Sequence, residues 1–121
     1  MSDMAKYLLL IYGDEQLWQA MSAEEIKNLQ EGHAAFAAAA GDAILGGHEL
    51  EPSITATSLR GQTSGRSRLT DGAFLETKEV LGGYYVVEAT DLDAAIALAE
   101  KLPELSAAHS GVEIRPIREG N

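Results

Sequence analysis

The stretch Tyr7-Leu-Leu-Leu-Ile-Tyr12 decides the fold, because it is apolar at every position and is followed directly by Gly13. An apolar run of this length, bounded by turn-forming residues, is typical of a β-strand that is buried on both faces. Residues 81–87 form a second near-continuous apolar run, which contains Gly82 and Gly83. The two runs predict two buried strands.

Two helices are expected, one after each apolar run. A capping-box pattern at Ser22 and Glu25 begins a helix over residues 23–40. Residues 90–93 carry another capping pattern, and Pro103 ends the helix that follows. Shorter strands are expected at residues 43–50, at residues 111–117, and in a hairpin made by residues 54–60 and 66–70.

This order of elements predicts an α+β fold, specifically a ferredoxin-like β-α-β-β-α-β fold with extra hairpin strands. Both helices then cover one face of an antiparallel sheet, so the apolar strand at residues 7–12 needs a second cover. A second copy of the sheet is the simplest cover, because an exposed apolar patch of this size marks an interface. We expect a homodimer through stacked sheets, with a long loop folded over the sheet as the alternative. No repeat or linker is visible, so residues 1–121 are expected to form a single domain.

The composition limits the partners. The 121 residues carry 9 basic and 19 acidic side chains, so the formal net charge is −10. An acidic surface repels phosphate groups, and nucleic acid and anionic membranes are therefore not expected as partners. Without cysteine the chain can form no disulfide, thiolate metal site or cysteine nucleophile. The longest early apolar run is too short for a signal peptide or a membrane-spanning helix, so a cytoplasmic protein is expected.

The segment Thr70-Asp-Gly-Ala-Phe-Leu-Glu-Thr-Lys-Glu-Val-Leu-Gly-Gly-Tyr84 resembles the DGPF segment of the YCII-related family. That family pattern reads roughly D-G-P-F-x-E-x-K-E-x-x-x-G-[YF], and Ala73 stands where the family usually has proline. Residues 6–12 are similar to the opening strand of the family, and residues 112–117 are similar to its ending. The resemblance therefore covers nearly the whole chain.

The resemblance implies a dimeric ferredoxin-like α+β barrel with a pocket between helix and sheet. It also implies a His–Asp pair with a catalytic role, for which His33 and Asp71 are the matching residues. One branch of the superfamily includes a dehydrochlorinase of chlorinated hydroxyquinones, whereas most members have no assigned substrate. Some bacterial members are encoded beside sigma factors of the extracytoplasmic-function class. Ala73 makes this turn less rigid than proline would, and this affects the direction in which the Asp71 side chain points.

His33 and Asp71 are the candidate catalytic residues. An imidazole exchanges protons near neutral pH, and a carboxylate beside it would fix the tautomer and stabilise the imidazolium. Asp71, at a turn, supplies that carboxylate if its loop folds over the helix. In the alternative, His33 is a core-edge histidine satisfied by a backbone carbonyl, and Asp71 belongs to a plain turn.

Four further residues are candidates for binding substrate. Glu76 could act as a second base and Lys78 could hold an anionic substrate, although a run of mixed charge is usually a solvated edge. Tyr84 and Tyr12 could bring hydroxyl groups into the pocket, although such tyrosines are more often core-edge residues.

No metal or cofactor is expected. His33, His48 and His109 lie 15 and 61 residues apart, without the close pairing that is typical of metal ligands. The glycines at 82–83 suggest close approach of another backbone or of a ligand ring, and they form no phosphate-binding motif. Trp18 is interpreted as a packing residue near the pocket rim or the dimer edge.

Three functions remain open from the sequence. The first is a small cofactor-independent enzyme, in which His33 transfers protons on a small molecule, with aromatic molecules among the candidates. The second is a non-catalytic module that binds a small ligand or a protein partner such as an extracytoplasmic-function sigma factor. The third is a stable dimer without a buried polar pocket.

Overall fold

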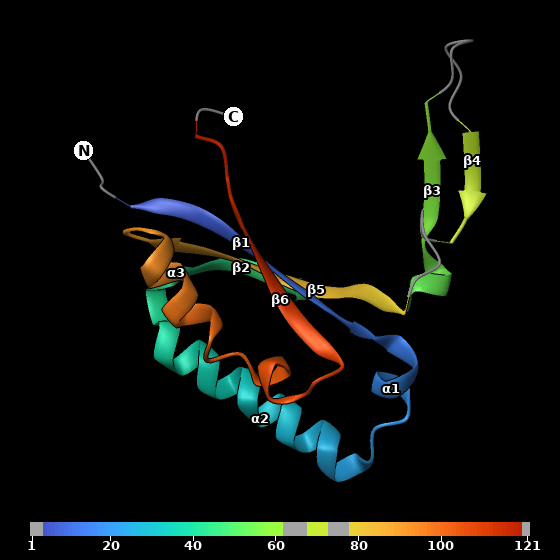
Figure 1. The fold of residues 1–121 in the computed structure, drawn as a ribbon, viewed down its shortest axis with the longest axis horizontal. Helices are drawn as coiled ribbons and strands as arrows, with labels where there is room; N and C mark the ends of the chain where they lie inside the picture. The colour runs from blue at the N-terminus through green and yellow to red at the C-terminus, as the bar shows by residue number, and fades with distance from the viewer. Residues whose placement is uncertain (1–3, 62–67, 73–77, 120–121) are drawn as a thin grey trace.

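The computed structural model describes residues 4–61, 68–72 and 78–119. Within these residues, four antiparallel strands form the main sheet in the order β2-β5-β1-β6 (Figure 1). The two apolar runs become its central strands, as predicted: β1 covers Ala5–Asp14 and β5 covers Glu79–Ala89. The flanking strands are β2 (Ile44–Glu49) and β6 (Ser110–Pro116). This α+β arrangement is compatible with a ferredoxin-like fold.

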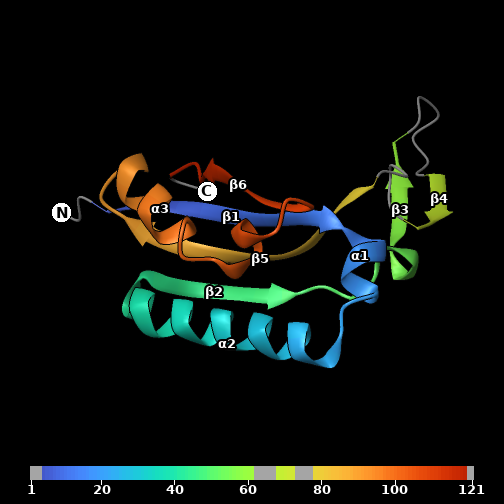
Figure 2. The ribbon, with the colours of Figure 1, turned by 60° about the horizontal axis from the view of Figure 1, so that its bottom comes forward.

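Helices α2 (Ala23–Ala40) and α3 (Leu92–Ala99) cover one face of this sheet, as expected (Figure 2). The predicted capping box begins α2: the Ser22 hydroxyl accepts from the Glu25 amide at 3.1 Å, and the Glu25 carboxylate accepts from the Ser22 amide at 3.0 Å. These hydrogen bonds with Ser22 stabilise the ionised carboxylate and lower the pKa of Glu25.

Two short helical segments differ from the sequence interpretation. Helix α1 (Glu15–Gln19) forms directly after β1, where only a turn was expected, because the Asp14 carboxylate caps the amides of Gln16 and Leu17. A short 3₁₀ helix, η3 (Pro103–Ser106), replaces part of the expected loop after α3. Both segments contribute to the candidate site described below.

The core lies between the main sheet and the two long helices. Tyr7, Leu9 and Ile11 alternate along β1 and point toward the helices, where Phe36 of α2 and Val87 of β5 are also buried. Burying an apolar side chain of this size contributes about 1.5–3 kcal/mol. The core therefore holds β1, β5 and α2 in fixed relative positions.

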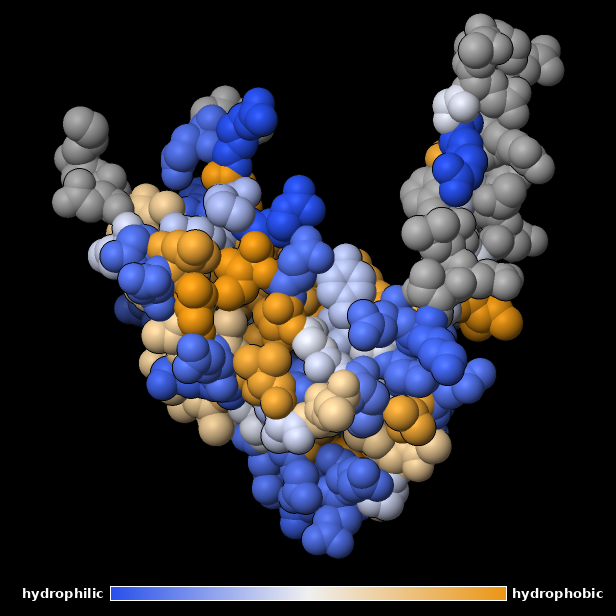
Figure 3. Space-filling model, in the orientation of Figure 1, coloured by the Kyte–Doolittle hydropathy of each residue, from blue (hydrophilic) through white to orange (hydrophobic). Residues whose placement is uncertain are grey.

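No helix of the described residues covers the opposite face of the main sheet, which we call the open face (Figures 1 and 2). Leu8 pairs with Val86 and Leu10 pairs with Tyr84 across β1 and β5. Directly paired residues share one face of a sheet, so these four side chains form a half-buried apolar band. Apolar side chains also reach the surface over α3 and the neighbouring strands (Figure 3). The association of two copies through the open face stays a prediction.

The predicted hairpin forms a second, two-stranded sheet beyond one end of the main sheet (Figure 1). Strand β3 (Thr57–Arg60) pairs antiparallel with β4 (Arg68–Asp71). Strand β3 begins three residues later than expected, and residues 66–67 of the second expected strand lie outside the described residues. Gly72, directly after β4, has a φ of 87°, a conformation that favours glycine. The Ser58 hydroxyl donates to the carbonyl of Gly72 at 2.6 Å and fastens this corner.

Candidate functional site

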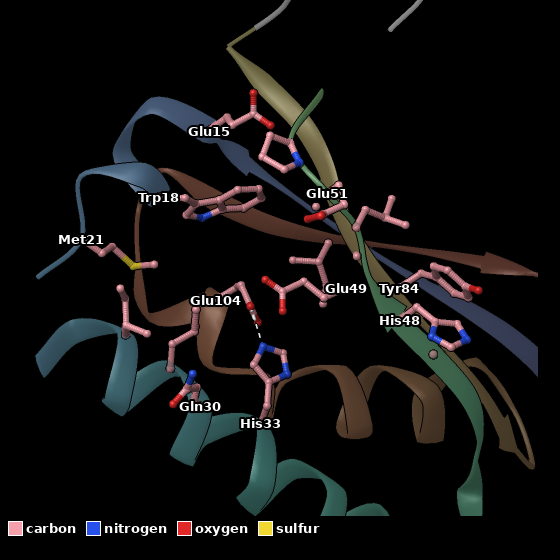
Figure 4. Close-up of a pocket in the computed structure, with 18 of the residues that line it drawn as sticks. Glu15, Trp18, Met21, Gln30, His33, His48, Glu49, Glu51, Tyr84 and Glu104 are labelled. Atoms are coloured by element: carbon pink, nitrogen blue, oxygen red, sulfur yellow. Dashed lines mark hydrogen bonds and ion pairs between the residues drawn. The ribbon is translucent and has the colours of Figure 1, made fainter. Parts of the chain in front are cut away.

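A pocket of about 630 Å³ lies between α2, α1, η3 and the end of the main sheet (Figure 4). Small-molecule sites usually measure roughly 300–1,000 Å³ and combine apolar walls with a few polar groups. The apolar walls of this pocket include Ile11, Trp18, Met21, Ile26, Leu29, Leu50 and Pro52. Its polar side chains include His33, Tyr85 and Glu104, which makes it the candidate functional site.

His33 lies at the centre of three hydrogen-bonded side chains, which we call the Tyr85–His33–Glu104 trio. Nε2 of His33 is 2.6 Å from Oε2 of Glu104, and Nδ1 is 2.8 Å from the hydroxyl of Tyr85. The His33 side chain is 26% exposed and the Glu104 side chain is 8% exposed. The imidazole therefore reaches solvent through the pocket while its carboxylate partner is buried behind it.

The chemistry of the three groups determines which atom donates in each hydrogen bond. An ionised carboxylate only accepts, so Nε2 of His33 donates to Glu104. In the neutral ring the other nitrogen has a lone pair, so Nδ1 accepts from the Tyr85 hydroxyl. A hydroxyl, an imidazole and a carboxylate in this order can pass one proton to the ring and stabilise the resulting imidazolium.

Gly32 of α2 allows Glu104 to lie close to His33. A Cβ atom on Gly32 would lie 2.5 Å from Cβ of Pro103, so only glycine lets η3 approach the helix this closely. Gly32 precedes His33, and Pro103 precedes Glu104. The close packing of the two backbones thus places the two functional side chains opposite each other.

The Tyr85 ring is held between its neighbours. Its centroid is 5.8 Å from that of His33 in a stacked arrangement and 4.8 Å from that of Phe36 in a tilted one. Burial raises the pKa of the Tyr85 hydroxyl, and the negative charge of Glu104 raises that pKa further. Tyr85 is therefore a neutral phenol at pH 7 and can donate its proton to His33.

Trp18 of α1 forms a wall of the pocket, in agreement with its interpretation as a packing residue near the rim. Its indole N–H donates to the hydroxyl of Ser110 at 2.9 Å. The ring lies against Gly13 of β1 and Gly82 of β5, and a Cβ atom on Gly82 would be 2.5 Å from Cζ3 of the indole. The sequence predicted another backbone or a ligand ring close to this glycine pair. At Gly83 the neighbour is the backbone of His48 on β2, whereas at Gly82 it is the Trp18 indole, a side chain of the protein itself.

The candidate residues from the sequence are placed as follows. His33 lines the pocket. Tyr84 contributes to its margin, but its side chain lies on the open face of the sheet beside the ring of His48, and the two ring centroids are 6.0 Å apart (Figure 4). Tyr12 lies on β1 outside the set of described residues that line the pocket, and Lys78 is exposed just before β5. The structure does not bring these two to His33.

The remaining candidates fall on parts of the chain that the structure describes incompletely. Asp71 ends β4, and its side chain lies outside the described residues, as does the whole of Glu76. The pairing of Asp71 with His33 stays a prediction. Both ring nitrogens of His33 already have partners, however, and one of them is a carboxylate that the sequence interpretation did not include.

Sequence reasoning missed Tyr85, Glu104 and Gly32. The sequence pattern predicts no helix or strand between Pro103, where the second helix ends, and the strand expected from residue 111, and nothing local marks Glu104 as buried. A usable signal was the glycine inside an alanine-rich helix, directly before a histidine, because a glycine in a helix costs about 1 kcal/mol relative to alanine and needs a packing reason.

Two kinds of feature are absent from the described residues. No group of three or more histidine, cysteine, aspartate or glutamate side chains among them could hold a metal ion. None of the helices in this part of the chain is both long and apolar enough to cross a membrane.

An antiparallel α+β domain with a polar pocket between helix and sheet matches a known family. The model of the YCII-related domain matches residues 5–121. An uncharacterized protein of Rhizobium meliloti (strain 1021) is 32% identical over 113 residues, which are 92% of this chain and 90% of that protein. The chain therefore belongs to the YCII-related domain family, as the resemblance in its sequence indicated.

Proposed function

We propose that this protein is a small acid–base enzyme in which the Tyr85–His33–Glu104 trio removes a proton from a small molecule in the pocket. The observation that carries the proposal is the unbroken chain from hydroxyl to imidazole to buried carboxylate, with links of 2.8 and 2.6 Å, at the wall of the pocket. This order of groups supports general-base catalysis without a nucleophile on the protein.

The proton transfer balances within the trio. The substrate gives a proton to the Tyr85 oxygen while the Tyr85 hydroxyl gives its own proton to Nδ1 of His33. The imidazole becomes an imidazolium, and Glu104 stabilises the new positive charge through Nε2. The substrate keeps the electron pair, which allows an isomerisation or the elimination of a leaving group.

A non-catalytic ligand-binding module is the second candidate, and one observation favours it. Both ring nitrogens of His33 are hydrogen-bonded in the structure, as they would be in a histidine that only supports the pocket wall. The same pocket would then bind a small molecule without changing it.

Exchange of carbon-bound hydrogen for deuterium separates the two candidates without knowledge of the product. A panel of small aryl ketones would be incubated with the protein in D₂O and followed by proton NMR. The enzyme proposal predicts accelerated exchange for at least one ketone, reduced about 100-fold or more in His33→Gln. His48→Gln is the matched control, since His48 borders the same pocket away from the trio.

Two further variants test which carboxylate acts on His33. We expect Glu104→Gln to lower the exchange rate strongly and Asp71→Asn to lower it little. The opposite ranking would restore the His33–Asp71 pair. Binding of a panel member without exchange in any variant would favour the ligand-binding module.

We also propose that two copies associate through the open face. The apolar band on β1 and β5 supports this, because water would otherwise contact Leu8, Leu10 and Val86 along the middle of the sheet. The trio lies on the opposite, helix-covered side of β5, so such a dimer would leave the pocket accessible.

A further inference from the structure

We infer that the pocket selects a small molecule with an apolar body and a protonated amine, and that Oε1 of Glu104 receives the amine. The inference rests on the proposed function in that it uses the same pocket and the same carboxylate.

The first observation is an unsatisfied buried atom. Oε1 of Glu104 is buried and has no hydrogen-bond partner among the described residues, while Oε2 is bonded to His33. The Glu104 residue is 7% exposed and lines the pocket. An unpaired buried carboxylate oxygen costs free energy, so a donor supplied by a ligand would satisfy an atom that the described part of the chain leaves unsatisfied.

The second observation is the charge of the pocket. Glu15, Glu49 and Glu51 line it together with Glu104, and the described lining residues include no lysine or arginine. Glu15 accepts from the amide and the hydroxyl of Ser53 at 2.7 Å each. Figure 4 shows the Glu49 side chain extending into the pocket toward Glu104 and His33. This pocket repels an anion and favours a cation over a neutral molecule of equal size.

The third observation concerns the body of the ligand. The indole of Trp18 forms one wall and is held by Ser110, while Met21, Leu29 and Leu50 contribute apolar surface. An aromatic wall next to carboxylates suits an organic cation, because the ring face attracts positive charge and the apolar walls bury the rest of the molecule. A metal ion would use neither feature.

This ligand class differs from the one suggested by Lys78 alone. An anionic substrate would need a cation in the pocket, and Lys78 is exposed outside the described lining. The overall charge of −10 also attracts cations to the molecule from a distance. The charge of the pocket and the charge of the whole protein therefore both favour a cationic ligand.

The test compares three probes that share one body: phenethylamine, phenethyl alcohol and phenylacetate. Isothermal titration calorimetry at low ionic strength should show the amine binding about tenfold more tightly than the alcohol, since a charged hydrogen bond is roughly twice as strong as a neutral one. Phenylacetate should give no binding heat. Phenylacetate binding as tightly as the amine, or no binding of any probe, would overturn the inference.

Variants identify the carboxylates involved. Glu104→Gln should lower the affinity for the amine about tenfold or more and change that for the alcohol much less. Glu49→Gln and Glu51→Gln alter exposed side chains, so they keep the test valid if Glu104→Gln fails to fold. Each should weaken amine binding several-fold. Glu113→Gln is the control, because it removes the same charge from β6, where Glu113 pairs with Arg115. An equal effect of this control would also overturn the inference.

Failure here is distinct from failure of the proposed function. Deuterium exchange without a preference for the amine would reject the ligand class and keep the acid–base proposal. A preference for the amine without deuterium exchange on any panel member would reject the acid–base proposal and keep the ligand class.

Discussion

At His33, one imidazole ring joins a helix, a strand and a 3₁₀ turn. Its two nitrogens contact Tyr85 of β5 and Glu104 of η3, so neither partner can be altered without changing the state of the ring. Burial raises the pKa of the Tyr85 hydroxyl, and the charge of Glu104 raises it further.

This raised pKa predicts how stability depends on alkaline pH. The folded protein holds the Tyr85 proton more tightly than the unfolded chain does. The bound Tyr85 proton therefore stabilises the folded state fully at pH values below about 10, the ordinary tyrosine pKa in the unfolded chain. This stabilisation is lost as the pH rises through the raised Tyr85 pKa of the folded protein. Absorbance titration should show one late-ionising tyrosine that disappears in Tyr85→Phe and remains in Tyr12→Phe. Glu104→Gln should lower the Tyr85 pKa, and an unchanged value would contradict a role for the Glu104 charge.

The contact between Gly82 and Trp18 predicts a second effect at the residue scale. Gly82→Ala places a methyl group 2.5 Å from the indole, so we expect destabilisation of about 1–3 kcal/mol from overpacking. Gly46→Ala is the matched control, because a Cβ atom on Gly46 has no neighbour within 4 Å. Trp18 is the only tryptophan, so its fluorescence reports the displacement directly. Equal stability losses in both variants would show that the indole does not limit this position.

Among the elements, those with local signals were predictable and those set by distant contacts were not. The apolar runs and the capping patterns at Ser22 and at residues 90–93 identified β1, β5 and the starts of both long helices, because these signals lie within a few residues. His33 was a candidate because it matches the histidine of the family that the sequence resembles and because an imidazole exchanges protons near neutral pH. Its partner Glu104 lies 71 residues further along and reaches it only through the packing of η3 on α2, which no local pattern encodes.

That packing predicts the effect of Gly32→Ala. In an exposed helix this substitution would raise the free energy of unfolding by about 1 kcal/mol, but here the new methyl group would contact Pro103. We expect a net loss of stability and a weaker His33–Glu104 hydrogen bond, observed by NMR as loss of the downfield imidazole N–H signal.

A double-mutant cycle supplies the control for this prediction. Adding Pro103→Ala to Gly32→Ala removes the clashing ring. The double variant should recover part of the lost stability and part of the His33–Glu104 hydrogen bond. Additive effects of the two changes would contradict direct packing between these residues.

For the whole molecule, the uncovered apolar band predicts self-association. Size-exclusion chromatography with light scattering should give the mass of a dimer for the parent protein. Leu10→Glu, in the centre of the band, should give a monomer, whereas Leu17→Glu on α1 should leave the dimer intact, although Leu17 is 48% exposed. A monomeric parent protein at high concentration would reject the dimer.

The trio also has a consequence for folding and for truncated forms of the chain. Its members are separated by 52 and 71 residues, so the site has a high contact order and cannot assemble on any short fragment. A polypeptide that ends before η3 would keep the sequence of α2 and β5 and still lack the carboxylate. Only a chain that extends through η3 can complete the trio, so we expect its hydrogen bonds to form late in folding.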